Sequence, residues 1–251
     1  MQKIKKKRLR IFIGPNGSGK STLFDEFSKN YNTGYFINAD NIERILKTKG
    51  FIDLEDYNIK ATQKELDSFF KKEEVRTLIE KSNNSGYKID IKLKENLIVD
   101  PSKMTHSYEG ALVAMFLREK LIENNESFSF ETVMSHSSKL KEIEDAKMLG
   151  YTTYLYFICI DDPEINISRI ENRVDKGGHK VADEKVISRY SKTLENLYPA
   201  MSLCNKSYLF DNSGEELTLI AETQEDHSLK LAVDEAKFPN WFKIYVLNHY
   251  L

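Results

Sequence analysis

Eight consecutive residues near the start of the chain match the phosphate-loop pattern G-x4-G-K-[ST] in full. They run from Gly14 to Ser21, between an apolar segment and a segment of helical spacing. In such a loop, glycines let backbone N–H groups turn toward phosphate oxygens, and the following helix adds its positive dipole end. The alternative is a glycine turn that binds nothing, but such a turn needs neither the lysine nor the serine.

The ligands that this loop predicts are ATP and Mg²⁺. Lys20 is placed to reach the β- and γ-phosphates, and the Ser21 hydroxyl to ligate Mg²⁺. The predicted nucleotide-binding residues of the loop are Gly14, Asn16, Gly17, Ser18, Gly19, Lys20, Ser21 and Thr22. Asp161 and Asp162 resemble the acidic pair of transporter ATPases, but Pro163 follows at once, so helix caps are expected there.

Polar side chains at two further predicted strand ends suit a phosphate acceptor. Asp40 ends the second predicted strand, and Glu131 and Thr132 end the third, with Ser135 one turn later. In open α/β sheets, ligands bind outside the carboxyl ends of the strands. Asp40 is therefore predicted to take the proton of a substrate hydroxyl, and all four residues to contact the substrate. The alternative is a helix cap, by Asp40 for the helix that starts near Asn41 and by Thr132 or Ser135 for the next one.

Arginines near the middle of the chain predict a helical lid. Arg169 and Arg173 are spaced i, i+4 on one predicted helix, and Arg189 lies on the next, with Gly-Gly-His at 177–179 between them. Two helices hinged by glycines could close over phosphates and exclude water. Arg169 and Arg173 are predicted to act on the transferring phosphate and Arg189 to bind the nucleotide. The alternative is an ordinary solvated face.

The elements that position these residues alternate between strands and helices. This order predicts a P-loop NTPase of the α/β class, with a parallel central sheet flanked by helices. Short apolar runs predict strands at 9–13, 35–37, 128–131, 154–160 and 208–211. Helical spacing predicts helices at 21–29, from about 41, at 138–149, after Pro163 and at 183–197.

Two stretches depart from this alternation. Residues 55–105 carry a helical pattern and then an alternating run from Tyr87 to Leu93, which predicts an inserted helix-plus-hairpin subdomain. After Gly214, a second hairpin is expected from 217–223 against 229–233, followed by an apolar segment with Trp241. We expect a kinase domain at 1–215, with an insertion at about 55–105, and a C-terminal hairpin and helical extension at 216–251.

Composition restricts the class of protein further. The net charge of −2 argues against a general nucleic-acid binder. Cys159 and Cys204 lie in or beside apolar segments without metal-ligand spacing, so both are expected to be small buried residues, as in a reducing compartment. No apolar run follows the N-terminal charges, and no segment approaches the roughly 18 apolar residues of a membrane span. A cytoplasmic location without membrane contact is expected.

Four blocks of the sequence, in this order, resemble the zeta-toxin-like P-loop kinases, particularly the stand-alone zeta-like ATPases. The blocks are the phosphate loop, the Ile-Asn-Ala-Asp run at 37–40, the run at 128–135, and the stretch from Arg173 through 177–181 to Arg189 and Tyr190. The resemblance covers about residues 8–215. It implies a kinase that phosphorylates a hydroxyl of UDP-N-acetylglucosamine and is held inactive by an antitoxin. It also implies that Asp40 is the base, that Glu131 and Thr132 contact the substrate, and that Arg169, Arg173 and Arg189 clamp phosphate.

The function expected from these observations is an ATP-dependent small-molecule kinase of the zeta-toxin type, with a nucleotide sugar as acceptor. Two alternatives stay open. One is a nucleoside, nucleotide or polynucleotide-end kinase, favoured if the lysines and arginines at 3–10 and the lysines at 88–94 line one groove. The other is a non-catalytic, nucleotide-gated binding module that would bind ATP without transfer to any acceptor.

Overall fold

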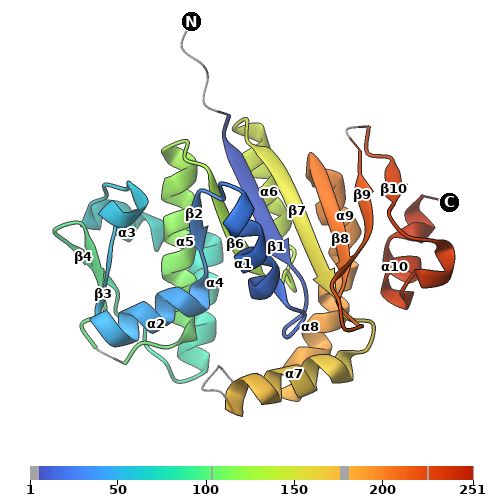
Figure 1. Ribbon diagram of the computed structural model, residues 1–251. Helices are drawn as coiled ribbons and strands as arrows, with labels where there is room; N and C mark the ends of the chain where they lie inside the picture. Colours follow the sequence, from blue (N-terminus) through green and yellow to red (C-terminus); the bar gives the residue numbers. More distant parts are fainter. Residues whose placement is uncertain (1–5, 103, 176–180, 225, 251) are drawn as a thin grey trace, which may run out of the picture. The chain divides into compact units, whose positions relative to one another are not determined.

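A computed structural model of the chain describes residues 6–102, 104–175, 181–224 and 226–250. The chain divides into two compact units. The first unit comprises Met1–Thr33 and Ser129–Leu251, and the second comprises Gly34–Phe128. The elements of both are labelled in Figure 1.

The first unit is built on strands in the order β10-β9-β8-β7-β1-β6. Their bounds are β1 Arg8–Ile13, β6 Phe128–Thr132, β7 Thr152–Cys159, β8 Lys206–Asp211, β9 Thr218–Thr223 and β10 Leu229–Leu231. The central pairs β1–β7 and β7–β8 are parallel, whereas β8–β9 and β9–β10 are antiparallel. The predicted α/β fold with a mostly parallel sheet is therefore confirmed. The predicted C-terminal hairpin is confirmed too, as β9 and β10, and it extends this sheet.

Helices cover both faces of the sheet in the first unit (Figure 1). They are α1 Lys20–Asn30, α6 Ser138–Met148, α7 Pro163–Asp175, α8 Asp183–Glu195, α9 Leu197–Leu203 and α10 Asn240–Tyr245, with short 3₁₀ turns at Glu235–Lys237 and Leu247–His249. Helix α1 lies on one face, α6 and α9 lie on the other, and α7 runs below the carboxyl ends of β1, β7 and β8. Cys159 and Cys204 are buried and free, as the sequence predicted.

The second unit packs helices around a small antiparallel sheet with the order β3-β5-β4. Its elements are β2 Tyr35–Ile37, α2 Ala39–Lys49, β3 Phe51–Asp53, a 3₁₀ turn Glu55–Tyr57, α3 Gln63–Phe69, α4 Glu73–Asn84, β4 Lys92–Lys94, β5 Leu97–Val99 and α5 Ser107–Glu123. The predicted hairpin is confirmed but is shorter than the alternating run from Tyr87 suggested. Its turn residues Glu95 and Asn96 both have positive φ, 51° and 64°, as a two-residue type I′ turn requires.

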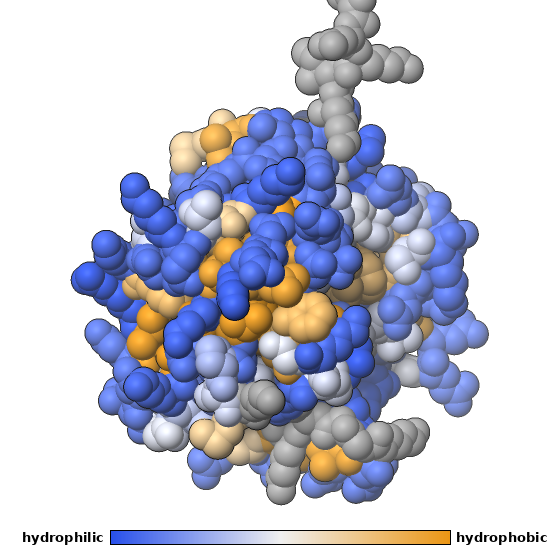
Figure 2. Space-filling view, turned by 90° about the vertical axis from the view of Figure 1, so that its left-hand side faces the viewer, coloured by the Kyte–Doolittle hydropathy of each residue, from blue (hydrophilic) through white to orange (hydrophobic). Residues whose placement is uncertain are grey.

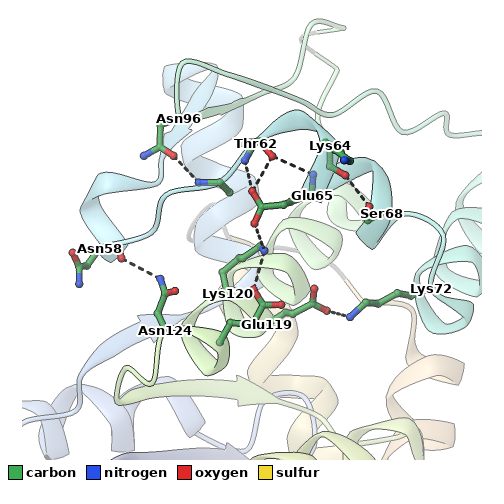
Figure 3. A network of polar contacts seen from close by, with 12 residues as sticks. Asn58, Thr62, Lys64, Glu65, Ser68, Lys72, Asn96, Glu119, Lys120 and Asn124 are labelled. Atoms are coloured by element: carbon green, nitrogen blue, oxygen red, sulfur yellow. Dashed lines mark hydrogen bonds and ion pairs between the residues drawn. The ribbon is translucent and has the colours of Figure 1, made fainter.

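A polar network holds the inserted segment on helix α5 within the second unit (Figure 3). Thr62 and Glu65 form a reciprocal capping box at the start of α3. Lys120 of α5, whose side chain is 8% exposed, donates to Glu65 at 2.7 Å and to Glu123 at 2.8 Å. A further ion pair joins Lys72 to Glu119. The insertion is thus tied to α5 by charge-assisted hydrogen bonds as well as by apolar packing.

Among the described residues, no helix combines the length and the apolar character that a membrane span needs. The surface is nevertheless not uniformly polar. Figure 2 shows apolar side chains between hydrophilic ones on the face that it draws. In the second unit, Phe51, Tyr87 and Met104 are exposed large hydrophobic residues.

Candidate active site

The phosphate loop lies between β1 and α1, in the context that the sequence predicted. A Cβ at Gly14 would lie 2.1 Å from the backbone oxygen of Ile158 on β7, so only glycine fits against that strand. Gly19 has φ 102° at the N-cap of α1, a conformation that favours glycine strongly. These constraints explain why the loop needs glycine for its backbone path and not only for flexibility.

Lys20 and Ser21 begin helix α1 at the end of this loop. The Lys20 ammonium donates to the Gly14 oxygen at 2.9 Å and to the Pro15 oxygen at 2.8 Å, so it lies against the loop itself. The Ser21 hydroxyl donates to Oε2 of Glu131 at 3.1 Å. The predicted metal ligand and a predicted substrate contact, 110 residues apart in the sequence, are therefore brought together.

The turn that follows β6 is held by hydrogen bonds from helix α8 and the residue directly after it. Met134 has φ 55°, and its N–H donates to Oγ1 of Thr132 at 3.1 Å. From α8 and its end, Thr193 Oγ1 donates to the Val133 oxygen at 2.7 Å and Asn196 Nδ2 donates to the Met134 oxygen at 2.9 Å. A left-handed, buried methionine at a strand end is a strained conformation that its surroundings must enforce.

The alternative in which Thr132 or Ser135 caps helix α6 is wrong. The first amide of α6, that of Ser138, donates to Nδ1 of His136 at 3.3 Å, so neither Thr132 nor Ser135 supplies that cap. Ser135 lies half-buried in the turn. Thr132 and Ser135 therefore stay predicted substrate contacts without a competing role at α6.

Asp40 lies in the second unit, in the first turn of α2. That helix begins at Ala39, and its N-cap is Asn38, whose side chain accepts from the Asn41 amide at 2.9 Å. The alternative in which Asp40 caps this helix is therefore wrong. Its carboxylate is exposed, and its role as base stays a prediction.

The three predicted lid arginines have different surroundings. Arg169 is half-buried on α7 and donates to the Asn212 oxygen at 3.0 Å, at the end of β8. Arg173 is exposed one turn further along α7, and Arg189 is half-buried on α8. The predicted hinge at 177–179 lies outside the described residues. The hydrogen bond of Arg169 connects its side chain to the neighbourhood of the phosphate loop, because Asn212 itself donates to the Ser18 oxygen.

Two asparagines that the sequence did not single out hold the phosphate loop from outside. Asn166, fully buried on α7, donates from Nδ2 to the Asn16 oxygen at 2.7 Å. Asn212, directly after β8, donates from Nδ2 to the Ser18 oxygen at 2.8 Å. Both bonds end on backbone carbonyls of the loop, so they act on its conformation.

The acidic pair after β7 has two separate structural roles. Asp162 Oδ1 accepts from the Glu164 amide at 2.9 Å and caps α7, as predicted. Asp161 instead accepts from the Trp241 amide at 2.9 Å and from Asn240 Nδ2 at 2.8 Å, so it holds the start of α10. Both carboxylates thus bond to amides at the start of a helix, as the sequence interpretation expected.

Burial suppresses the acidity of two groups next to this edge of the sheet. It raises the pKa of the Cys159 thiol, which is fully buried. It also raises the pKa of Tyr190, whose hydroxyl donates to the Ile160 oxygen at 2.8 Å. Both groups stay neutral at physiological pH, so Cys159 is a packing residue and not a nucleophile.

Comparisons with known proteins show solved structures with a similar fold, but no named family is identified by sequence. No protein-family model matches the chain. An uncharacterized protein of Haemophilus influenzae is 36% identical over 69 residues, which are 28% of this chain and 49% of that protein.

Solved structures extend the likeness over nearly the whole chain. A chain of the AvrRxo1-ORF1:AvrRxo1-ORF2 complex with sulphate ions superposes with a TM-score of 0.52 at 14% identity, covering 92% of this chain and 62% of that one. The same complex with ATP gives 0.50 at 14% identity, covering 90% and 61%. The chain therefore spans about half of the H. influenzae relative and about three fifths of the AvrRxo1 chain. The chain has the fold of a zeta-toxin-like P-loop kinase.

A chain of the PezAT toxin-antitoxin system of Streptococcus pneumoniae superposes with a TM-score of 0.46 at 13% identity, covering 96% of this chain and 77% of that one. At such identities, what the structures share with this P-loop kinase fold is the arrangement of elements. The chemistry depends on the residues of this chain.

A sequence signal for the two loop-holding asparagines is weak. Asn166 sits in the first turn of α7, and Asn212 follows the last core strand, which is a carboxyl end like those of β1 and β6. The second position was available to strand-end reasoning, because ligands and their supports gather at that edge in α/β folds. The first position has no local signal, since only the folded chain brings α7 to the loop.

Proposed function

We propose that this chain is an ATP-dependent small-molecule kinase, which transfers the γ-phosphate of ATP to a hydroxyl group. The observation that carries the proposal is the arrangement of Lys20, Ser21 and Glu131 at the end of a complete phosphate loop. A cation, a hydroxyl and a carboxylate there provide what phosphoryl transfer needs most, which is charge neutralisation in a fixed geometry.

ATP is the proposed phosphate donor. The amides of the loop and the N-terminus of α1 would bind the β-phosphate, and Lys20 would exchange its bonds with the Gly14 and Pro15 oxygens for bonds with phosphate oxygens. The crystallised complex of AvrRxo1-ORF1 and AvrRxo1-ORF2 with ATP supports this ligand for a chain of the same fold. Arg169, Arg173 and Arg189 are proposed to approach the γ-phosphate as a clamp.

Mg²⁺ is proposed to be held by Ser21 and Glu131. Their side-chain oxygens lie 3.1 Å apart, and hydroxyl and carboxylate oxygens are the ligands that Mg²⁺ prefers. When bound, the ion would supply positive charge that neutralises the phosphates. The hydrogen bond to Ser21 favours this role for Glu131 over the direct substrate contact that the sequence predicted.

Asp40 is the proposed general base. Its carboxylate is exposed and is not used for capping. It would accept the proton of the acceptor hydroxyl as that oxygen bonds to the γ-phosphorus. The bond from the γ-phosphorus to the bridging oxygen then breaks, and ADP leaves with that oxygen.

The proposed acceptor is a nucleotide sugar such as UDP-N-acetylglucosamine, with Thr132 and Ser135 as contacts. The test incubates the purified chain with Mg²⁺, γ-labelled ATP and one acceptor at a time: UDP-N-acetylglucosamine, a nucleoside, a polynucleotide end, or a cell metabolite extract. Products are identified by mass, with Lys20→Ala as the inactive control. A labelled nucleotide sugar supports the proposal. A different labelled product shows that the acceptor is another compound, and the proposed acceptor is then wrong. ATP binding without transfer to any acceptor refutes the kinase and leaves a nucleotide-gated binding module.

An antitoxin is the proposed protein partner. Support comes from the AvrRxo1-ORF1 structures, which contain AvrRxo1-ORF2. In the second unit, the exposed side chains of Phe51, Tyr87 and Met104 are apolar or aromatic surface that a partner could cover. Co-expression with the product of the neighbouring gene, followed by co-purification and loss of transfer activity, tests this partner.

A further inference from the structure

Two backbone carbonyls of the phosphate loop, those of Asn16 and Ser18, are held by side chains from distant parts of the first unit. Asn166 donates to the first and Asn212 to the second, at 2.7 Å and 2.8 Å. These partners lie 150 and 194 residues further along the chain. The two bonds hold alternate peptide units of the loop.

The geometry of the peptide unit gives these bonds a consequence for anion binding. A trans peptide is planar, and its C=O and N–H groups point in opposite directions. A carbonyl of Asn16 directed toward Asn166 therefore directs the Gly17 N–H away from Asn166. In the same way, a carbonyl of Ser18 directed toward Asn212 directs the Gly19 N–H away from Asn212. These glycine amides are among the loop donors that bind phosphate oxygens in a loop of this type.

We propose that Asn166 and Asn212 are positioning residues, which hold the phosphate loop in its anion-binding conformation before the nucleotide arrives. The identity of the nucleotide as ATP rests on the proposed function. The orientation of the amides does not depend on that function. A loop that is already oriented loses less conformational freedom on binding, and this difference appears as affinity.

Close packing on both sides of the loop supports this role. A Cβ at Gly17 would lie 2.7 Å from the backbone oxygen of Asn166, and a Cβ at Gly19 would lie 2.6 Å from Nδ2 of Asn212. The asparagines therefore pack so closely on the loop that a side chain does not fit at either glycine. Rotation of either peptide plane would also break its hydrogen bond to an asparagine.

The segment that carries Asn212 is bonded to β7 and to the C-terminal helix. Its own N–H donates to the Cys159 oxygen at 2.8 Å, and the neighbouring Asp211 accepts from Nε1 of Trp241 at 2.8 Å. Trp241 is 2% exposed, and its N–H donates to Asp161. Ser213, on the other side of Asn212, bonds to both Asp211 and Asp161. Trp241 thus acts on the loop through the segment that carries Asn212.

The first experiment compares Asn212→Ala with Asn205→Ala. Asn205 lies before β8 and accepts from Thr153, so its variant loses hydrogen bonds of the same strand away from the loop. Calorimetry measures the dissociation constant for ATP, and thermal unfolding measures stability. We expect Asn212→Ala to weaken ATP binding about tenfold, the usual effect of one hydrogen bond, and Asn205→Ala to leave it unchanged. Equal ATP affinities in the wild type and in a folded Asn212→Ala protein overturn the proposal, whatever happens to stability.

A second variant covers the case in which Asn212→Ala does not fold. Trp241→Phe keeps an aromatic ring but removes the donor to Asp211, and we expect it to weaken ATP binding about threefold. Trp241 is also the single tryptophan of the chain, so its fluorescence in the wild-type protein should change when ATP binds. Unchanged ATP affinity in Trp241→Phe overturns the role of the C-terminal helix.

Pyrophosphate separates this inference from the proposed function. If wild-type protein binds pyrophosphate but not ATP, the ATP-dependent kinase fails, and the same variants are then measured with pyrophosphate. Weaker pyrophosphate binding by Asn212→Ala still supports the positioning role. If wild-type protein binds neither ligand, the loop is not an anion site and both proposals fail.

Discussion

Replacement of Gly110 by alanine tests whether the crossing of α2 and α5 positions the proposed base. Gly110 lies in the first turns of α5, and a Cβ there would lie 2.7 Å from the Ala39 oxygen and 2.9 Å from the Cβ of Glu43. Ala39 directly precedes Asp40, and Glu43 is 2% exposed on the same helix. Because both contacts involve backbone or the base of a side chain, a flexible tip cannot move away, and the helices must separate.

The required movement follows from these distances. Ordinary contact begins at 3.4 Å, so the methyl group needs about 0.7 Å more room beside the Ala39 oxygen. Overpacking of this kind costs about 1–3 kcal/mol of stability. A displacement near 1 Å of a catalytic group costs up to about a hundredfold in rate. We therefore expect Gly110→Ala to lower kcat for transfer by about ten- to a hundredfold while KM for ATP stays unchanged.

The assay is steady-state transfer to the acceptor found in the labelling experiment. Gly214→Ala is the matched control, because a Cβ at that position meets nothing within 4 Å. Gly110→Ala is also measured in an Asp40→Asn background, where it should cost less than about twofold more, since the base is already absent. Normal kcat in Gly110→Ala, or losses that multiply with Asp40→Asn, would refute the reasoning. Hydrogen exchange of the α2 amides checks the displacement without relying on activity.

Four further predictions concern single side chains. Lys20→Ala should abolish transfer with an unchanged circular dichroism spectrum, because the ammonium acts on phosphate and its two hydrogen bonds end on backbone carbonyls within the loop. Asp40→Asn should retain ATP affinity and lose about a hundredfold or more in kcat, since an amide cannot take a proton and Asn38 still caps α2. Glu131→Gln should raise the Mg²⁺ concentration needed for half-maximal transfer by about tenfold, measured by titration at fixed ATP. Burial and the charge of Asp100 raise the pKa of Glu109 from 4.5 to about 7, so the folded protein holds a proton there that the unfolded chain releases. This contribution to stability is complete below about pH 4.5 and is lost as pH rises through 7; Glu109→Gln should remove this decline in melts recorded between pH 5 and 8.

The elements that local patterns predicted best are those with a strong boundary signal. The phosphate loop, β1 and α1 follow from glycines, a lysine and a short apolar run, and α6 begins at Ser138 as predicted. Helix α5 was not predicted, although its 17 residues make it a long helix. Most residues of this helix are buried, including the charged Glu109 and Arg118. The helix therefore lacks the one-sided apolar stripe by which a surface helix is recognised in a sequence.

Site residues show the same division between local and tertiary information. Lys20 and Ser21 are recognisable from spacing alone, because the loop is a contiguous motif. The contact of Ser21 with Glu131 requires β6 to lie beside β1 in the sheet. The order of the strands cannot be predicted from the sequence of either strand. Asp161 was correctly expected to cap a helix, but the helix is α10, nearly 80 residues later. The local sequence therefore predicts that a side chain can cap a helix, but only the folded structure identifies which helix it caps.

The phosphate-loop motif is therefore an incomplete description of the anion site it encodes. Its glycines allow the amides to turn inward. They do not fix the amides in that orientation, because a glycine backbone adopts other conformations at little cost. In the first unit the orientation comes from Asn166 on α7 and Asn212 after β8, both outside the motif. Helix α7 also carries Arg169, which donates to the oxygen of Asn212. A movement of α7 that brought its arginines toward phosphate would thus act on both asparagines at once. If the predicted lid closes by such a movement, its closure would be coupled to the orientation of the loop through these hydrogen bonds, and substitutions at Asn166 would alter nucleotide affinity and the kinetics of closure together.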